Sequence, residues 1–344
     1  MTRIDAATAR ALLCDLVETP SVSGNEGACA ERLVAFFEEH GRSARIDEVG
    51  NVRAPADDAV LLTSHLDTVP GEIPVRVEDG VLWGRGSVDA TGPLVALAVA
   101  AVETGTSFAG VVREETDSAG ARHLVADREP PGAVINGEPS GWDAITLGYR
   151  GILSGTYRVA TESRHTSLPE PNAIQQAMRW WDAVESTVES PEETPLFEQV
   201  TAKPVEMAGG TAGDGLSVEA ALDCQLRIPP GTTATELQAT VGKLVETGEI
   251  DWGEPIPPVM ESPRNPVARG LRQGIRDQQG EPTHLRKSGT SDMNVYAAAW
   301  DVPMATYGPG DSALDHAPDE RLDLATFDRA ISVLRVAAEA LVAE

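Results

Sequence analysis

The chain has 344 residues, 41% hydrophobic and 24% charged, a composition that excludes disordered, collagen-like and fibrous proteins. Its 54 acidic residues outnumber 27 basic ones, for a net charge of −27, and only Lys203, Lys243 and Lys287 among the basic residues are lysines. A surface this acidic repels nucleic-acid phosphates and anionic membranes, so we expect neither as a partner.

The charge also predicts the salt in which the protein works. Self-repulsion on this scale strains a compact fold in dilute buffer, whereas molar salt shortens the Debye length to ~3 Å and removes most of the repulsion. Acid excess together with few lysines therefore favours a halophilic protein. The alternative is an ordinary acidic enzyme.

The start of the chain and the cysteines indicate the cytoplasm. Residues 1–5 show no basic patch leading into an apolar stretch, so we expect no secretory signal. The longest apolar run, 93–102, has about half of the ~20 residues that a membrane-spanning helix needs. Cys14, Cys29 and Cys224 are odd in number and far apart, as expected in a reducing compartment.

The first half of the chain alternates predicted helices with short apolar strands. Helical spacing covers 6–19, which stops at Pro20, and a second helix is predicted over 25–40. Strands are predicted over 59–64, 108–112 and 133–136, with a helix over 92–102. This alternation favours an α/β fold, with a mostly parallel sheet and helices on both of its faces.

The pattern changes at Gly151. A strand over 152–160, a helix over 172–189, a strand over 217–228 and a helix over 232–247 have the size of a small domain. A proline-rich linker follows, and the α/β pattern resumes with the elements predicted over 267–279, 304–307 and 325–342. We therefore expect a discontinuous catalytic domain, 1–151 and 263–344, interrupted by a smaller inserted α+β domain, 152–262.

Carboxylates and histidines follow the predicted strands, where functional groups of open α/β sheets gather. Gathering them at one sheet edge is prohibitively repulsive unless cations neutralise them. Nitrogen and oxygen ligands without thiolates suit zinc, with cobalt or manganese as substitutes. If Asp89 bridges, each of two metal ions receives three ligands. The residues are His65, Asp67, Asp89, Glu114, Glu115, Glu138 and His316.

Each of these motifs is weak alone. The triplet His65-Leu66-Asp67 is most often an ordinary loop, and the pair Glu114-Glu115 is by default solvated. Gly84-Arg85-Gly86 resembles the start of a dinucleotide loop, but Asp89 stands where that fingerprint needs its third glycine. Only the set predicts a metal site.

Seven motifs follow one another along the chain: TSHLDTVPG (63–71), GRGSVDATG (84–92), REETDSAG (113–120), NGEPS (136–140), SRHTS (163–167), GTSDMN (289–294) and YGPGDSALDHAPDE (307–320). In this order they resemble the co-catalytic zinc amidohydrolases, a family that includes acetylornithine deacetylase, succinyl-diaminopimelate desuccinylase, aminoacylase and glutamate carboxypeptidase. The resemblance extends from residues 19–26 to the last predicted helix. Relatives often have lysine where this chain has Thr91, and some have an asparagine pair where it has Gly213-Asp214-Gly215.

The resemblance implies a role for each site residue. His65, Asp89 and Glu138 would hold one ion, and Asp89, Glu115 and His316 the other. It also implies a cis peptide bond after Asp89.

The same resemblance implies residues that bind substrate and move protons. Glu114 would be the general base, taking a proton from the attacking water and passing it to the departing amine, while Asp67 would hold the ring of His65. His165 would stabilise the developing oxyanion, often from a neighbouring subunit. Arg227 would receive a substrate carboxylate, and Thr290 would lie in a substrate loop.

LGYRG (147–151), GTSDMN and the final motif look most like the hydrolases that release lysine or ornithine from a small acidic amino-group carrier protein. Acetylornithine deacetylase, acting on a small N-acyl diamino acid, is the alternative. A scaffold that keeps the fold without hydrolysis is less favoured, because every chemical position is filled. An unrelated metallophosphatase is less favoured still, because it would leave the motif order and the inserted domain with its histidine unexplained. Inserted domains of this kind frequently pair, so a homodimer is expected.

Overall fold

The computed structural model describes residues 3–343 and divides them into two compact units. The larger unit comprises the chain up to Leu147, Glu261–Arg286 and the chain from Ser291 onward; the smaller unit comprises Gly148–Met260 and Lys287–Thr290. The smaller unit thus begins at Gly148, whereas the prediction placed the end of the first segment at residue 151, and it also includes the separate segment Lys287–Thr290. Arg150 explains why this segment belongs to the smaller unit, because its Nε donates to the carbonyl of Ser288 at 2.9 Å.

A nine-stranded sheet forms the centre of the larger unit, in the order β1-β2-β6-β3-β7-β15-β8-β13, with β14 also paired to β8. The four central strands β6, β3, β7 and β15 are parallel, and antiparallel strands flank them. The fold class predicted from the sequence is confirmed. The strands are β1 (Arg45–Ile46), β2 (Val52–Ala54), β3 (Asp57–His65), β6 (Thr106–Val111), β7 (Val134–Gly137), β8 (Ala144–Tyr149), β13 (Val259–Met260), β14 (Thr283–Lys287) and β15 (Met304–Thr306).

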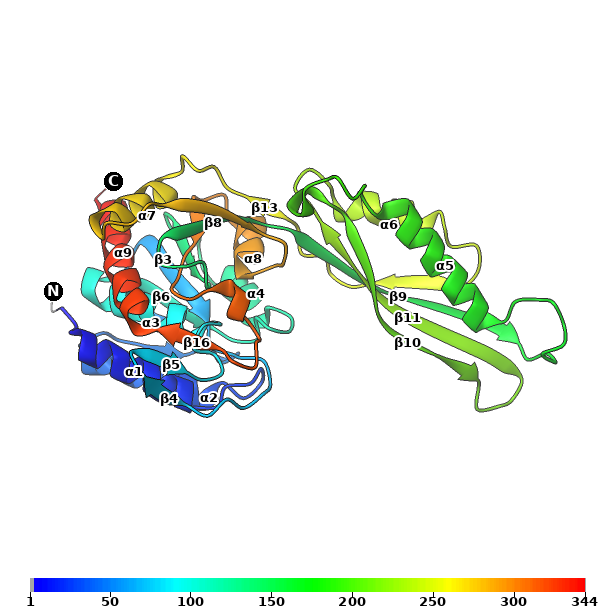
Figure 1. Ribbon diagram of the computed structural model, residues 1–344, viewed down its shortest axis with the longest axis horizontal. Coiled ribbons are helices and arrows are strands. Elements are labelled where there is room, and N and C mark those ends of the chain that lie inside the picture. The colour runs from blue at the N-terminus through cyan, green and yellow to red at the C-terminus, as the bar shows by residue number, and fades with distance from the viewer. Residues whose placement is uncertain (1–2, 344) are drawn as a thin grey trace. The chain divides into compact units, whose positions relative to one another are not determined.

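Helices cover this sheet. Figure 1 shows α9 beside both α3 and α7, and α3 and α9 also contact β3. Every residue of α3 is buried, which explains its almost continuously apolar sequence. A small sheet of β4 (Arg76–Glu78), β5 (Val81–Trp83) and β16 (Arg321–Asp323) completes the unit. The helices are α1 (Ala6–Glu18), α2 (Gly27–Glu39), α3 (Thr91–Thr104), α4 (Ala119–Asp127), α7 (Pro266–Asp277), α8 (Asp292–Ala299) and α9 (Leu324–Val342).

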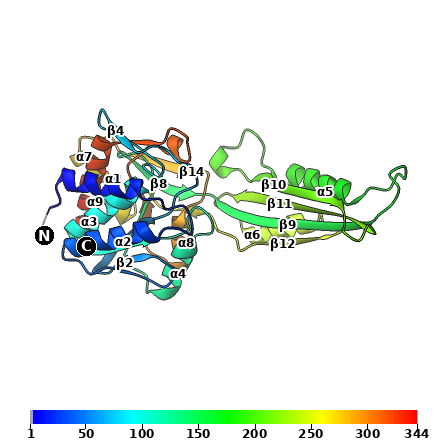
Figure 2. The same ribbon diagram turned by 90° about the horizontal axis from the view of Figure 1, so that it is seen from below.

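The smaller unit is an antiparallel sheet in the order β10-β11-β9-β12, with α5 (Ala173–Val188) packed on one face. Figure 2 shows α5 lying along the strands. Alternation in β9 (Gly151–Glu162) and β11 (Ser217–Ile228) sends Tyr157 and Leu222 toward the buried face. The sequence reading missed β10 (Thr201–Thr211) and β12 (Glu249–Trp252), and α6 (Ala234–Gly242) is shorter than predicted.

None of the helices described within residues 3–343 combines the length and the hydropathy needed to cross a membrane.

Candidate metal centre

The register of the parallel strands brings three loops to one sheet edge. His65, the last residue of β3, pairs with Val111 at the end of β6, and Ser64 pairs with Gly137 at the end of β7. Because parallel strands end on the same side, the segments that follow them meet there. Glu114 and Glu115 follow β6, and Glu138 follows β7.

Asp89 lies between two imidazole rings. Its Oδ1 is 3.2 Å from Nε2 of His65, and its Oδ2 is 3.2 Å from Nε2 of His316. The ring of His316 also lies 3.0 Å from Oε2 of Glu115. Ligand atoms of His65, Asp89 and Glu115 all fall within 4.8 Å of one another, a spacing that could hold a metal ion. A central carboxylate with a histidine on each side is the arrangement that a bridging ligand requires.

The pKa values of His65, Asp89 and His316 depend on one another's charges. Burial alone would lower the pKa of His65, but hydrogen bonds to Asp67 and Asp89 raise it well above its ordinary value. The hydrogen bond to Asp89 raises the pKa of His316 to about 9. Burial would raise the pKa of Asp89, but its bonds to His316 and His65 lower it. The rise in the pKa of both rings therefore has a common cause, the negative charge of the carboxylates around them.

The other carboxylates are crowded. Burial and then the neighbouring Glu138 raise the pKa of Glu114 well above its ordinary value. Burial and then Asp89 raise the pKa of Glu115. Glu138 is buried and also acts electrostatically on His65, so all five predicted metal ligands lie in one electrostatic neighbourhood. Such a donor set fits divalent cations, which would relieve the repulsion.

Asp67 makes more hydrogen bonds than the role that the resemblance implied for it requires. Nδ1 of His65 lies closer to the carbonyl oxygen of Asp67, at 2.8 Å, than to its carboxylate, at 3.5 Å. The carboxylate instead accepts the backbone N–H groups of Glu114 at 3.0 Å and Glu115 at 3.2 Å, and the hydroxyl of Ser23 at 2.7 Å. Asp67 therefore orients the turn that carries the predicted base as well as the ring of His65.

Glu320 is a functional residue that the sequence reading missed. Its fully buried carboxylate accepts the backbone N–H groups of Gly86, Val88 and Asp89 at 2.8–3.1 Å and pairs with Arg85 at 2.8 Å. It thus fixes the turn that presents Asp89, whose following peptide bond is cis, as the resemblance implied. The signal was present, because Glu320 is the last residue of the motif that contains His316.

Asp292 was also missed. It is 1% exposed at the start of α8, and its Oδ1 has no hydrogen-bond partner. Burial raises its pKa to about 7, against the opposing charge of His65. Its place in GTSDMN was a signal, although only Thr290 of that motif was selected from the sequence.

The three predicted substrate residues lie in the smaller unit, so their relation to the carboxylates of the larger unit stays a prediction. His165 is exposed after β9, and its Nδ1 lies 2.8 Å from the hydroxyl of Ser167. Arg227 is half-buried on β11, and its Nη1 has no hydrogen-bond partner. Thr290 ends the segment that Arg150 fastens.

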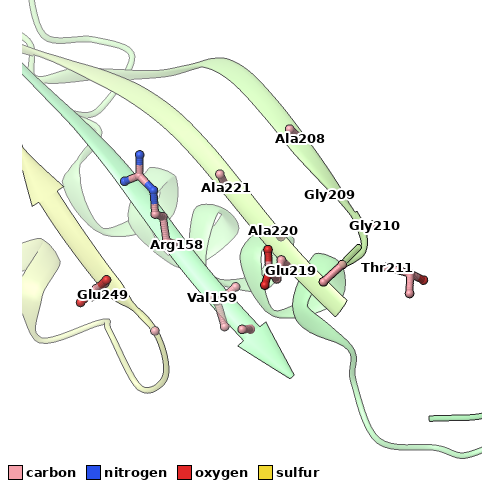
Figure 3. Close-up of a pocket in the computed structure, with 13 residues that line it drawn as sticks. Arg158, Val159, Ala208, Gly209, Gly210, Thr211, Glu219, Ala220, Ala221 and Glu249 are labelled. Carbon is pink, nitrogen blue, oxygen red and sulfur yellow. The ribbon is translucent and has the colours of Figure 1, made fainter. Parts of the chain in front are cut away.

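A pocket of about 830 Å³ in the smaller unit contains none of the predicted site residues. Figure 3 shows Ala208, Ala221, Arg158 and Glu249 across its four strands. The pocket exists because many of its lining residues are alanine or glycine, and its lining includes no histidine or cysteine. The candidate metal ligands described above all lie outside this pocket.

Comparisons with known proteins agree with this geometry. Residues 61–340 match Peptidase family M20/M25/M40. A LysW-lysine hydrolase of Deinococcus radiodurans is 39% identical, with 98% of each chain covered, and a LysW-lysine/LysW-ornithine hydrolase of Saccharolobus islandicus is 29% identical over 93% of this chain and 91% of the relative. The crystal structure of a Bacillus subtilis protein described as a dinuclear metal-binding peptidase from the M20 family superposes with a TM-score of 0.73 at 14% identity, covering 98% of both chains. The resemblance drawn from the motifs is confirmed, and the chain belongs to Peptidase family M20/M25/M40.

Proposed function

We propose that this protein is a metal-dependent hydrolase that releases lysine or ornithine from the C-terminal glutamate of an amino-group carrier protein. The observation that carries the proposal is the Asp89 carboxylate held between two histidines, with Glu114 on the adjoining turn. The names of the Deinococcus and Saccharolobus relatives supply the substrate class. Three free cysteines agree with a cytoplasmic enzyme.

Two divalent ions fit the donor set. We assign His65, Asp89 and Glu138 to one ion and Asp89, Glu115 and His316 to the other, with zinc preferred and cobalt as a substitute because every ligand is nitrogen or oxygen. When bound, the ions would act as Lewis acids toward the amide carbonyl and lower the pKa of the attacking water.

The chain's own residues carry the protons and the orientation. Glu114 takes a proton from the attacking water and returns it to the departing amine. Its carboxylate can do so only if it is ionised first, and cations beside it would reverse the rise in its pKa. Asp67 sets the direction of Glu114 through the backbone N–H. His165 donates to the developing oxyanion, and Arg227, with an unpartnered Nη1, receives the substrate carboxylate.

Turnover of separate substrates tests the proposal. Purified protein loaded with zinc or cobalt in molar potassium chloride is incubated with carrier-bound lysine, carrier-bound ornithine or N-acetylornithine. We expect release of free lysine or ornithine from the carrier. Turnover of N-acetylornithine alone would identify a deacetylase, and no turnover of any amide would identify a scaffold.

The variant Glu114→Gln tests whether Glu114 is the general base. The variant should lose nearly all turnover, roughly a 10²–10⁴-fold loss, while its metal content stays unchanged. Asp117→Asn, an exposed substitution on the same turn, is the matched control. Retained activity of Glu114→Gln would remove this residue as the base.

We also propose a homodimer formed through β10. Within the described chain this strand pairs in the sheet only with β11, and its Val205 and Met207 are 60% and 43% exposed. An unpaired edge with apolar side chains is a template for a second copy. Size-exclusion chromatography with light scattering should give a dimer, and Val205→Lys with Met207→Lys should give a monomer. A monomeric wild type would contradict this proposal.

A further inference from the structure

Asp292 is a buried carboxylate of the larger unit to which the proposed function gives no role. It is the first residue of α8, it is 1% exposed, and its Oδ1 has no hydrogen-bond partner. Burying an ionisable group without a full set of hydrogen-bond partners lowers the stability of the folded chain. The presence of a carboxylate at this position therefore needs an explanation other than the stability of the fold.

The helix does not need this side chain as a cap. Ser291 and Asn294 form a capping box at the start of α8. Oγ of Ser291 accepts from the backbone N–H of Met293 at 3.3 Å, and Oδ1 of Asn294 accepts from the backbone N–H of Ser291 at 3.0 Å. An uncharged side chain at the first helical position would leave this box intact. The charge of Asp292 is therefore not required to start the helix.

The packing of α8 places Asp292 beside the candidate metal centre. Tyr296 lies one turn further along the same side of the helix, and its hydroxyl is 3.0 Å from the hydroxyl of Thr63 on β3. Thr63 and His65 point to the same face of the sheet, because side chains alternate along a strand. Asp292 and the imidazole of His65 therefore lie on the same side of the sheet, and the two side chains interact electrostatically.

The surroundings of Asp292 disfavour its charge. Burial is the largest effect and raises its pKa to about 7. His65, Ser118 and Arg122 favour the ionised form, whereas Asp67 disfavours it, and together they do not offset the burial. A carboxylate whose pKa is raised by folding destabilises the folded chain when it is ionised, and this effect is complete above the raised pKa. Above about pH 7 the charge of Asp292 therefore weakens the metal-free fold.

The same charge would attract cations to the site. Burial and Glu138 raise the pKa of Glu114, and Asp292 adds to that rise, so its field reaches the predicted base. Salt screens exposed charges strongly but buried charges much less. In the molar salt that the net charge of −27 leads us to expect, exposed acids would add little to the attraction of a divalent ion. Asp292 would keep its effect there.

We propose that Asp292 is an outer anion of the candidate metal centre: it increases the affinity for divalent cations without ligating them, and it lowers the stability of the metal-free fold. This inference rests on the metal centre of the proposed function and adds a residue that determines its affinity. A side chain with a structural role alone would have the opposite effect on stability, because its replacement would destabilise the fold.

The variant Asp292→Asn tests both parts of the proposal, since it removes the charge and keeps the size of the side chain. Metal-free protein in molar potassium chloride, at about pH 8 where Asp292 is ionised, is titrated with zinc by calorimetry and unfolded with urea. We expect the dissociation constant for zinc to rise roughly ten- to a hundredfold. The urea midpoint of the metal-free variant should lie above that of the wild type, because a buried charge has been removed.

Two further variants are matched controls. Asp301→Asn removes the same charge at an exposed position just beyond the end of α8, and in molar salt it should change neither the zinc affinity nor the urea midpoint. Ser291→Ala weakens the capping box without a change in charge. It should lower the urea midpoint and leave the dissociation constant for zinc within about twofold of the wild-type value.

Three outcomes would overturn the inference: an unchanged zinc affinity in Asp292→Asn, a urea midpoint of this variant below that of the wild type, or an equal loss of zinc affinity in either control. A wild type that binds no zinc would contradict the proposed metal centre as well. Zinc binding without turnover of any amide would contradict the proposed reaction and leave the role of Asp292 to be decided by the titrations.

Discussion

Replacing Glu320 with glutamine tests how Asp89 is held. Oε1 of Glu320 accepts from Val88 and Asp89, and Oε2 accepts from Gly86 and Arg85. Glutamine keeps one oxygen, so two of the four donors would face an NH₂ group. Hydrogen bonds to charged groups contribute about 1.5–3 kcal/mol each, and losing two should lower the free energy of unfolding by about 3–6 kcal/mol. A misplaced Asp89 should also lower metal affinity roughly 10–100-fold.

Two measurements decide this prediction. Urea unfolding of the metal-free protein gives the change in stability, and calorimetric titration with zinc gives the change in affinity. The control is Asp319→Asn, an exposed neighbour that pairs with Arg321 and should change stability by less than about 1 kcal/mol. Unchanged zinc affinity in Glu320→Gln would refute the reasoning, even if stability fell, because Glu320 would then support the fold without orienting Asp89.

Three further predictions concern protons, metal and salt. In the metal-free protein the pKa of His316 is raised from 6.5 to about 9, so its protonated ring stabilises the fold fully below pH 6.5, and this contribution is lost as the pH rises through 9. Because its side chain is 51% exposed, urea unfolding at both ends of this range should show a loss of only about 1–2 kcal/mol, and constant stability would contradict the assignment. Zinc must displace protons from His65 and His316, so binding heats near pH 7 should vary with the ionisation enthalpy of the buffer; identical heats would exclude these ligands. Circular dichroism should show full folding only as salt is added, whereas full folding without salt would remove the halophilic interpretation.

The sequence predicted those parts of the fold whose apolar pattern is strong. The alternation of β11 and the apolar spacing of α9 gave nearly the observed bounds. β10 was missed because Pro204 and the pair Gly209-Gly210 are unfavourable within a strand. An edge strand tolerates them, since one side of its backbone needs no partner in the sheet.

The residues of the candidate site also fall into those that could be predicted from the sequence and those that could not. Residues at the end of a buried strand or directly after it, such as His65 and Glu138, could be selected from position alone. The role of Glu320 could not be predicted from its position in the motif, because its contacts to the backbone of Gly86 and Asp89 depend on long-range pairing between β16 and β5. The unpartnered oxygen of Asp292 likewise becomes evident only when α8 is packed.

The order of the candidate ligands along the chain has a consequence for biosynthesis. His65 leaves the ribosome well before His316, which follows 251 residues later in the chain. A nascent or prematurely terminated chain that lacks β15 and the loop after it would expose Asp89 and Glu115 without their second imidazole. Such fragments should capture metal poorly, so hydrolytic competence would arise only once the segment that carries His316 has been synthesised.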